Sequence, residues 1–153
     1  GEWLRRERST QDSPALSEAD RMALAKLDEE DWWNDRAVLA ELRDPIMRAA
    51  ATYYMTARDR RRFPIDQVAR FHLGNGARLE RLNWPADLSA RARKQSFGLM
   101  VNYLYDLGDI EKNHEAFAET RAVIATSAVR KLARPIRALV PAPAKVETVA
   151  PSA

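Results

Sequence analysis

Hydrophobic residues recur at steps of three and four between residues 35 and 58, which predicts the longest helical segment of the chain. Pro45 lies inside this segment, and a proline removes a backbone donor and clashes with the preceding helical turn. We therefore expect two helices here, with Asp44 capping the second and Pro45 at its first position. The apolar stripe consists of Val38, Leu39, Leu42, Ile46, Ala49, Ala50, Tyr53 and Tyr54.

The two ends of the chain lack such a pattern. Residues 1–16 are polar and contain serine, threonine and proline, so we interpret them as a tail or linker. Ser17 precedes two acidic residues, Glu18 and Asp20, which predicts a short helix with Ser17 as its N-cap. Residues 135–153 are rich in proline and alanine, and we expect a disordered tail there. The domain is thus predicted to span residues 17–134.

The pattern changes after Pro64. Residues 68–73 are mixed, and the following Gly74-Asn75-Gly76 predicts a turn because these residues tolerate positive φ. Apolar residues interleaved with charged ones predict a strand at 78–84, and an apolar run predicts a largely buried strand at 98–105.

The remaining elements are helical. A short helix is expected at 89–96, and residues 109–133 form a second helical region in which Asn113 and His114 are candidates for a break. Strands that bracket a short helix, with further helices on both sides, indicate an α+β domain in which a few β-strands pack with flanking α-helices.

Composition excludes several classes of function. The 25 basic residues exceed the 22 acidic residues by only three, which is too few to indicate a nucleic-acid surface. No stretch approaches the roughly 20 apolar residues of a membrane span, so we expect no membrane partner. The absence of cysteine excludes disulfides, zinc–thiolate sites and cysteine nucleophiles. The chain begins at Gly1 without an initiator Met or signal peptide, and we expect a fragment or processed product.

Two histidines dominate the small set of catalytic candidates. His72 precedes the Gly74-Asn75-Gly76 turn, and we expect it at the mouth of a strand, where the glycines allow a ligand to approach. An imidazole suits proton transfer, because its reference pKa is near neutrality. The alternative is a buried histidine that only packs. His114 lies in a polar patch and is expected to be a solvated helix or cap residue.

Tyr103 and Tyr105 fall on one face of the second predicted strand, from which they reach a site beside His72 or fill the core. The arginine-rich run at 58–62 is expected to be a solvated loop after a helix, although it also suits phosphate binding. Trp32 and Trp33 are expected to pack. No histidine–carboxylate spacing indicates a metal site.

Two blocks of sequence are recognisable. The run 64–84 contains Phe-His-Leu-Gly-Asn-Gly-Ala and ends in Leu-Asn-Trp, and the run 96–105 contains Gly-Leu-Met-Val-Asn-Tyr-Leu-Tyr. Both blocks, and the spacing between them, resemble the C-terminal catalytic region of malonyl-CoA decarboxylases over residues 64–119. Pro85 departs from the usual residue of that family.

This resemblance implies a C-terminal portion of a GNAT-like acyltransferase fold and the decarboxylation of malonyl-CoA to acetyl-CoA and CO2. It implies no metal and no cofactor, since CoA is part of the substrate. His72 is then catalytic together with a serine, Tyr105 lies near the same site, and Asn75 and Gly76 are candidates for substrate binding. The family also suggests a homo-oligomer in the bacterial cytoplasm, with mitochondrial or peroxisomal relatives.

The resemblance also indicates what this chain lacks. The catalytic serine and the CoA-binding loop of the family precede the histidine block, and none of Ser9, Ser13, Ser89 and Ser96 matches that serine. We therefore expect the chain to be inactive alone. Two alternatives stay open: a non-catalytic CoA- or protein-interaction module derived from the same fold, and a small helical adaptor that binds acidic partners through its basic run.

Overall fold

The computed structural model describes residues 1–134, and within them it confirms an α+β domain. None of the helices in this range is both long and apolar enough to cross a membrane. The elements in chain order are α1 (Glu2–Ser9), α2 (Glu18–Leu24), η1 (Ala25–Asp28), η2 (Trp32–Asn34), α3 (Arg36–Thr56), α4 (Gln67–Gly74), β1 (Arg78–Asn83), α5 (Ala90–Ser96), β2 (Met100–Leu104), α6 (Ile110–Thr120) and α7 (Ser127–Leu132).

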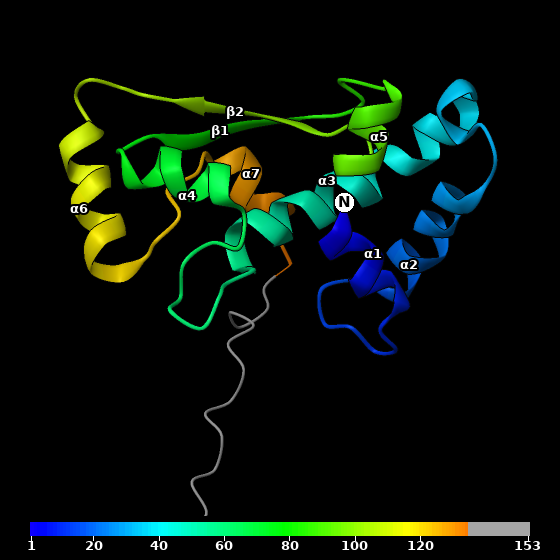
Figure 1. Ribbon diagram of the computed structural model, residues 1–153, viewed down its shortest axis with the longest axis horizontal. Helices are drawn as coiled ribbons and strands as arrows, with labels where there is room; N and C mark the ends of the chain where they lie inside the picture. The colour runs from blue at the N-terminus through cyan, green and yellow to red at the C-terminus, as the bar shows by residue number, and fades with distance from the viewer. Residues whose placement is uncertain (135–153) are drawn as a thin grey trace, which may run out of the picture.

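The two strands form an antiparallel sheet, which lies along one side of the molecule (Figure 1). Leu79 pairs with Tyr103 and Arg81 pairs with Asn102, so Glu80 is the extra residue of a bulge in β1. The backbone of Leu79 also exchanges hydrogen bonds with the 124–126 segment, at 2.8 Å to the Ile124 carbonyl and 3.1 Å from the Thr126 amide. The bulged start of β1 is therefore held from both edges.

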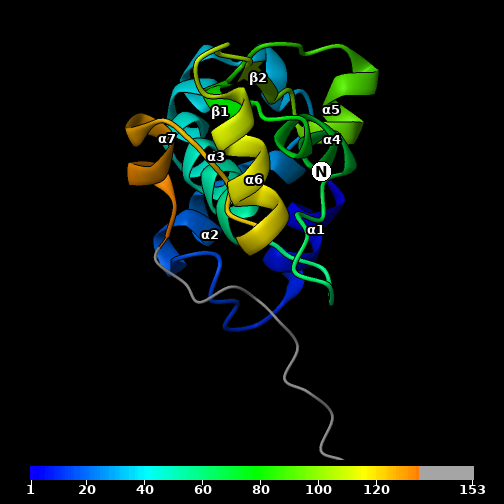
Figure 2. The ribbon, with the colours of Figure 1, turned by 90° about the vertical axis from the view of Figure 1, so that its left-hand side faces the viewer.

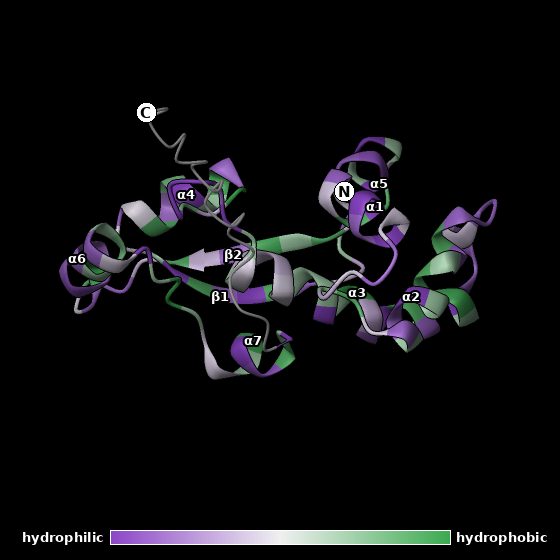
Figure 3. Ribbon diagram, turned by 90° about the horizontal axis from the view of Figure 1, so that it is seen from below, coloured by the Kyte–Doolittle hydropathy of each residue, from purple (hydrophilic) through white to green (hydrophobic). Residues whose placement is uncertain are grey.

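The helices cover one face of this sheet. α3 runs beneath the strands, and α4 and α7 lie on either side of the second half of α3 (Figures 1 and 3). α6 closes one end of the molecule, while α1, α2 and α5 gather at the other end (Figures 1 and 2). Both strands carry hydrophilic as well as hydrophobic residues in Figure 3, as expected for a sheet with one covered face.

Three clusters of buried side chains hold these elements together. The first joins the N-terminal helices to α3 and to Phe97, which follows α5, and the Trp32 and Trp84 rings stack within it with centroids 6.5 Å apart. The second packs α3 and α7 against β1, around Leu79 and Leu82. The third joins α4 to α6 and consists of Ala69, Leu73, Phe117 and Val123.

The expected break at Pro45 is wrong, because α3 continues from Arg36 to Thr56 as one helix. Asp44 caps nothing here; the cap is Asp35, whose carboxylate accepts hydrogen bonds from the amides of Ala37 and Val38. Pro45 is itself buried, and the stripe around it packs into two clusters. This long-range packing outweighs the local cost of about 3 kcal/mol for a proline in a helix.

Residues 1–16 are not a linker. Glu2–Ser9 form α1, and its Trp3 and Leu4 are buried in the first cluster, where Trp3 packs on Tyr53 with ring centroids 5.1 Å apart. The buried Ser13 hydroxyl donates to the Glu7 carboxylate at 2.6 Å. The polar composition of this segment did not predict a helix, because only two apolar side chains of α1, Trp3 and Leu4, pack into the core.

The two short helices that the sequence predicted after Ser17 and at 89–96 are confirmed. Ser17 caps α2 and Ser89 caps α5, in each case through a side-chain oxygen that accepts an amide hydrogen bond. The first predicted strand is β1. The guanidinium group of Arg58 binds the last carbonyls of α3, which suits the negative end of the helix dipole.

Two other expectations need correction. β2 is not largely buried, since Met100, Asn102 and Leu104 are exposed and only its alternate residues face the helices. The 109–133 region is two helices, and the break lies at residues 121–126 and not at Asn113 and His114. The hydrogen bonds of Leu79 draw this segment into an extended conformation beside β1. The predicted tail at 135–153 lies outside the described residues.

Leu79→Ala is expected to lower the free energy of unfolding by about 2–5 kcal/mol, because Leu79 is fully buried in the second cluster. Leu107→Ala removes the same atoms from a side chain that is 92% exposed, and should change stability by less than about 0.5 kcal/mol. Urea unfolding followed by circular dichroism measures both. Equal losses in the two variants would contradict the assignment of Leu79 to the core.

Candidate active site

His72 lies in the last turn of α4, and not at the mouth of a strand as expected. The helix forms because the Asp66 carboxylate accepts the Ala69 amide at 2.8 Å, and because Ala69 and Leu73 bury one side of it against α6. The pattern of residues 68–73 did not predict this helix, because its cap and the helix it packs against both lie outside that segment. The glycine turn that follows α4 is present as predicted, and it leads directly into β1.

Two tyrosines from β2 and the residues after it meet the His72 ring. The Tyr103 ring stacks on the imidazole, with centroids 4.5 Å apart and planes 21° apart. The Tyr105 hydroxyl lies 2.8 Å from Nδ1 of His72, which is hydrogen-bond distance. Phe71 packs edge-on against the same imidazole at 5.3 Å. The structure therefore brings together His72 and both tyrosines, from segments 33 residues apart.

The imidazole is accessible. His72 is half-buried, and its neighbours Phe71 and Tyr105 are 65% and 40% exposed. Within residues 1–134, Nδ1 has the Tyr105 hydroxyl as its partner and Nε2 has none. A histidine that only packs would be enclosed on all sides, so the geometry favours a ring that can reach a ligand.

The turn after His72 is held by α6. The Asn113 side-chain amide donates to the Gly76 carbonyl at 3.2 Å, and Nδ1 of the exposed His114 donates to the Gly74 carbonyl at 2.6 Å. Gly76 has φ +90°, and a Cβ there would lie 2.3 Å from the Ile110 carbonyl oxygen. Asn75 is exposed, and its side chain donates back to the Phe71 carbonyl at 2.9 Å. Gly76 thus has a clear structural role, and substrate binding by Asn75 and Gly76 stays a prediction.

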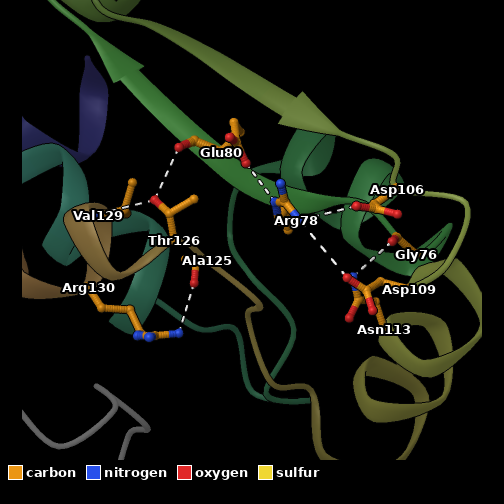
Figure 4. Close-up of polar contacts among 10 residues, drawn as sticks. All are labelled: Gly76, Arg78, Glu80, Asp106, Asp109, Asn113, Ala125, Thr126, Val129 and Arg130. Carbon is orange, nitrogen blue, oxygen red and sulfur yellow. Dashed lines mark hydrogen bonds and ion pairs between the residues drawn. The ribbon is translucent and has the colours of Figure 1, made fainter.

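An ion-pair network fixes the segment after Tyr105. Arg78 contacts the carboxylates of Glu80 at 2.6 Å, Asp106 at 3.8 Å and Asp109 at 4.0 Å. Figure 4 shows this guanidinium between β1 and the start of α6, beside the Asn113–Gly76 contact. Asp106 directly follows Tyr105, so the network ties the loop that carries the Tyr105 hydroxyl to the sheet. It also leaves Arg78 surrounded by carboxylates and not available to an anionic ligand.

Three partly buried tyrosines, Tyr53, Tyr54 and Tyr103, remain neutral phenols at physiological pH. Burial raises the pKa of Tyr103 and of Tyr54, and the Asp66 carboxylate adds to both shifts. Burial also raises the pKa of Tyr53 to about 12. Neutral rings at Tyr103 and Tyr54 suit packing and stacking. Residues 1–134 contain no group of three or more histidine and acidic side chains suited to a metal ion.

A family model of the malonyl-CoA decarboxylase C-terminal domain matches residues 1–145. This chain belongs to the malonyl-CoA decarboxylase family. The match includes residues 1–16, which were expected to be a linker or tail. The resemblance inferred from the two sequence blocks is confirmed.

Relatives of known name and structure agree. The mitochondrial malonyl-CoA decarboxylase of Anser anser anser is 37% identical over 99 residues, which are 65% of this chain and 19% of that protein. The Rattus norvegicus protein is 33% identical over 102 residues, 67% of this chain and 20% of that protein. The chain therefore spans about a fifth of these relatives' length.

Solved decarboxylases share the fold. The Rhodopseudomonas palustris malonyl-CoA decarboxylase is 50% identical, with a TM-score of 0.84 over 87% of this chain and 30% of that one. The Agrobacterium vitis malonyl-CoA decarboxylase is 46% identical, with a TM-score of 0.79 over 86% of this chain and 32% of that one. About two thirds of each solved decarboxylase lies outside the matched region.

Sequence reasoning missed the residues that brace the site. Asn113 and His114 were considered only as a helix break and a solvated position, although both hold the glycine turn. Arg78 looked like an ordinary strand residue. Asn113 and His114 lie 37 and 40 residues along the chain from the glycines they contact, so no local spacing in the sequence indicates these hydrogen bonds.

Gly76→Ala is expected to destabilise the domain by more than about 1 kcal/mol, because an L residue is strained at φ +90° and its Cβ would collide with the Ile110 backbone. Gly108→Ala is the matched control, since a Cβ there would meet only the Asp106 carboxylate at 3.5 Å. Urea unfolding measures the free energies. An unchanged Gly76→Ala protein would contradict the tight contact between the turn and α6.

Proposed function

We propose that this chain supplies the histidine of a malonyl-CoA decarboxylase active site, as the C-terminal part of a longer catalytic unit. The observation that carries the proposal is the His72–Tyr105 hydrogen bond on an accessible surface of a domain from this family. We propose malonyl-CoA as the substrate because the curated and solved relatives are named malonyl-CoA decarboxylases. The chain spans only a fifth to a third of those relatives, so catalysis is assigned to the whole enzyme.

The reaction needs charge stabilisation and one proton. Breaking the bond between the α-carbon and the carboxylate of malonyl-CoA releases CO2 and leaves the electron pair as a thioester enolate. A group that donates a hydrogen bond to the enolate oxygen lowers the barrier, and a proton delivered to the α-carbon then completes acetyl-CoA. His72 has a ring nitrogen free for either step among the described residues. As the neutral ring it donates a hydrogen bond to the enolate oxygen, and as imidazolium it delivers the proton to carbon and returns to the neutral ring. We assign the Tyr105 hydroxyl the role of orienting the imidazole.

The surroundings of His72 favour a site that further protein completes. Phe71 is 65% exposed, Val68, one turn earlier in α4, is 59% exposed, and Tyr105 is 40% exposed. An active site that handles an enolate must exclude water, which these uncovered side chains do not do alone. The part of the relatives that this chain does not span is the source we propose for the missing wall and for the catalytic serine.

Several predictions from the family stay predictions. They are the GNAT-like form of the complete domain, a reaction without metal or organic cofactor, and assembly as a homo-oligomer. A cytoplasmic location in bacteria is also proposed. Relatives named as mitochondrial and relatives from bacteria are both among the matches.

A chimera tests the role of His72. We replace the matched region of the Rhodopseudomonas palustris protein with this chain, which is 50% identical to it, and measure acetyl-CoA formation from malonyl-CoA. The chimera should be active, and His72→Ala should lower kcat by about 10²–10⁴-fold, the usual contribution of a general acid. Met22→Ala changes an exposed side chain of α2, at the other end of the molecule (Figure 1), and should stay within a few-fold of the parent chimera.

The chimera separates the proposal from its alternative. If His72→Ala keeps full activity in a folded chimera, the imidazole has no catalytic role and the proposal fails. A non-catalytic interaction module predicts that outcome, or no activity in any chimera that folds and binds CoA.

The isolated 153-residue chain should release no CO2 from malonyl-CoA above the uncatalysed rate. The reason is that the serine expected for catalysis has no counterpart in this sequence. A coupled assay for acetyl-CoA measures the rate at high protein concentration, with the active chimera as the positive control. Steady turnover by the isolated chain would show that the site is complete within these residues.

A further inference from the structure

We propose that Tyr103 is a positioning residue, which together with Tyr105 holds His72 as the Nε2–H tautomer in a single ring orientation. Nε2–H is then the free donor of the imidazole. The inference rests on the proposed function for its catalytic meaning, and it concerns the state in which the ring waits for a substrate. It is carried by the stacking and hydrogen-bond geometry of three side chains.

The tautomer follows from the chemistry of the pair. The Tyr105 hydroxyl and Nδ1 of His72 are 2.8 Å apart, so one of them donates and the other accepts. A phenol, with a reference pKa of about 10, is a much stronger acid than a neutral imidazole N–H, and the imidazole lone pair is the more basic acceptor. The Tyr105 O–H therefore donates to Nδ1. The ring proton of neutral His72 is then on Nε2.

Stacking supplies the second constraint. A hydrogen bond to one nitrogen leaves the imidazole free to tilt, whereas a ring stacked at 4.5 Å and 21° fixes its plane. Within that plane, only one of the two ring flips places Nδ1 opposite the Tyr105 hydroxyl. Tyr103 selects the plane and Tyr105 selects the flip, so both are needed for one orientation.

Tyr103 can impose this plane because it is itself held. Its backbone pairs with the fully buried Leu79 in the strand ladder. Its ring packs against the second and third buried clusters, which also contact Tyr54. The stacking surface is therefore part of the folded core of the domain, whereas His72 is near its edge.

Nitrogen NMR of the 153-residue chain tests the tautomer without any enzymatic assay. Long-range proton–nitrogen spectra of ¹⁵N-labelled protein distinguish a protonated from an unprotonated ring nitrogen, and the His114→Gln variant assigns the two histidines. At a pH where the ring is neutral, Nδ1 of His72 should be unprotonated, with the Nε2–H form in about tenfold excess. A predominant Nδ1–H form would overturn the inference.

Substitutions at Tyr103 and Tyr105 test the two constraints. Tyr103→Leu removes the stack and should lower the tautomer excess several-fold, while Tyr103→Phe keeps the ring and should match the parent. Tyr105→Phe removes the donor and should also lower the excess. A Tyr103→Leu spectrum identical to that of the parent would exclude a positioning role for Tyr103.

A measurement on the unsubstituted chain covers the case in which Tyr103→Leu does not fold. The stack predicts nuclear Overhauser contacts between the Tyr103 and His72 ring protons, and an upfield shift of the imidazole protons. Their absence would overturn the inference. This result is independent of the chimera assay. The expected tautomer together with inactive chimeras would contradict only the proposed function. The opposite tautomer together with active chimeras would contradict only this inference.

Discussion

The packing of α4 between the sheet and α6 is the constraint on which the site depends. Ala69 and Leu73 bury one side of this two-turn helix against Phe117, and the remaining side carries Phe71 and His72 outward. A helix of eight residues is marginal by itself, so its conformation comes from this packing and from the Asp66 cap. If α4 moved, His72 would lose both tyrosines together, because those residues belong to a different element.

Three kinds of contact hold the segments that make up the site. Hydrophobic burial fixes α4 and Tyr103, hydrogen bonds from α6 fix the glycine turn, and the carboxylates around Arg78 tie down the loop after Tyr105. The first of these is the strongest, since exposed ion pairs contribute little individually. The result is a firmly held imidazole on an open surface, which suits one part of a larger active site.

Elements with local causes were predictable from the sequence. Ser17 and Ser89 cap their helices through amides three residues later, and β1 follows a glycine turn and interleaves leucines with charged residues. Elements with distant causes were not. α3 continues through Pro45 because both halves pack into the core, and α1 exists because Trp3 reaches Tyr53, 50 positions along the chain.

The sequence by itself determined the family and the presence of a glycine turn, since these depend on residue types at short spacing. It also singled out His72 as the candidate for catalysis. It also determined that Tyr103 and Tyr105 share a face, because strand side chains alternate. Only the tertiary structure decided that Tyr103 stacks on the imidazole while the Tyr105 hydroxyl meets Nδ1. Stacking and hydrogen bonding act over a few ångströms, and it is folding that brings residues 72 and 105 within that range.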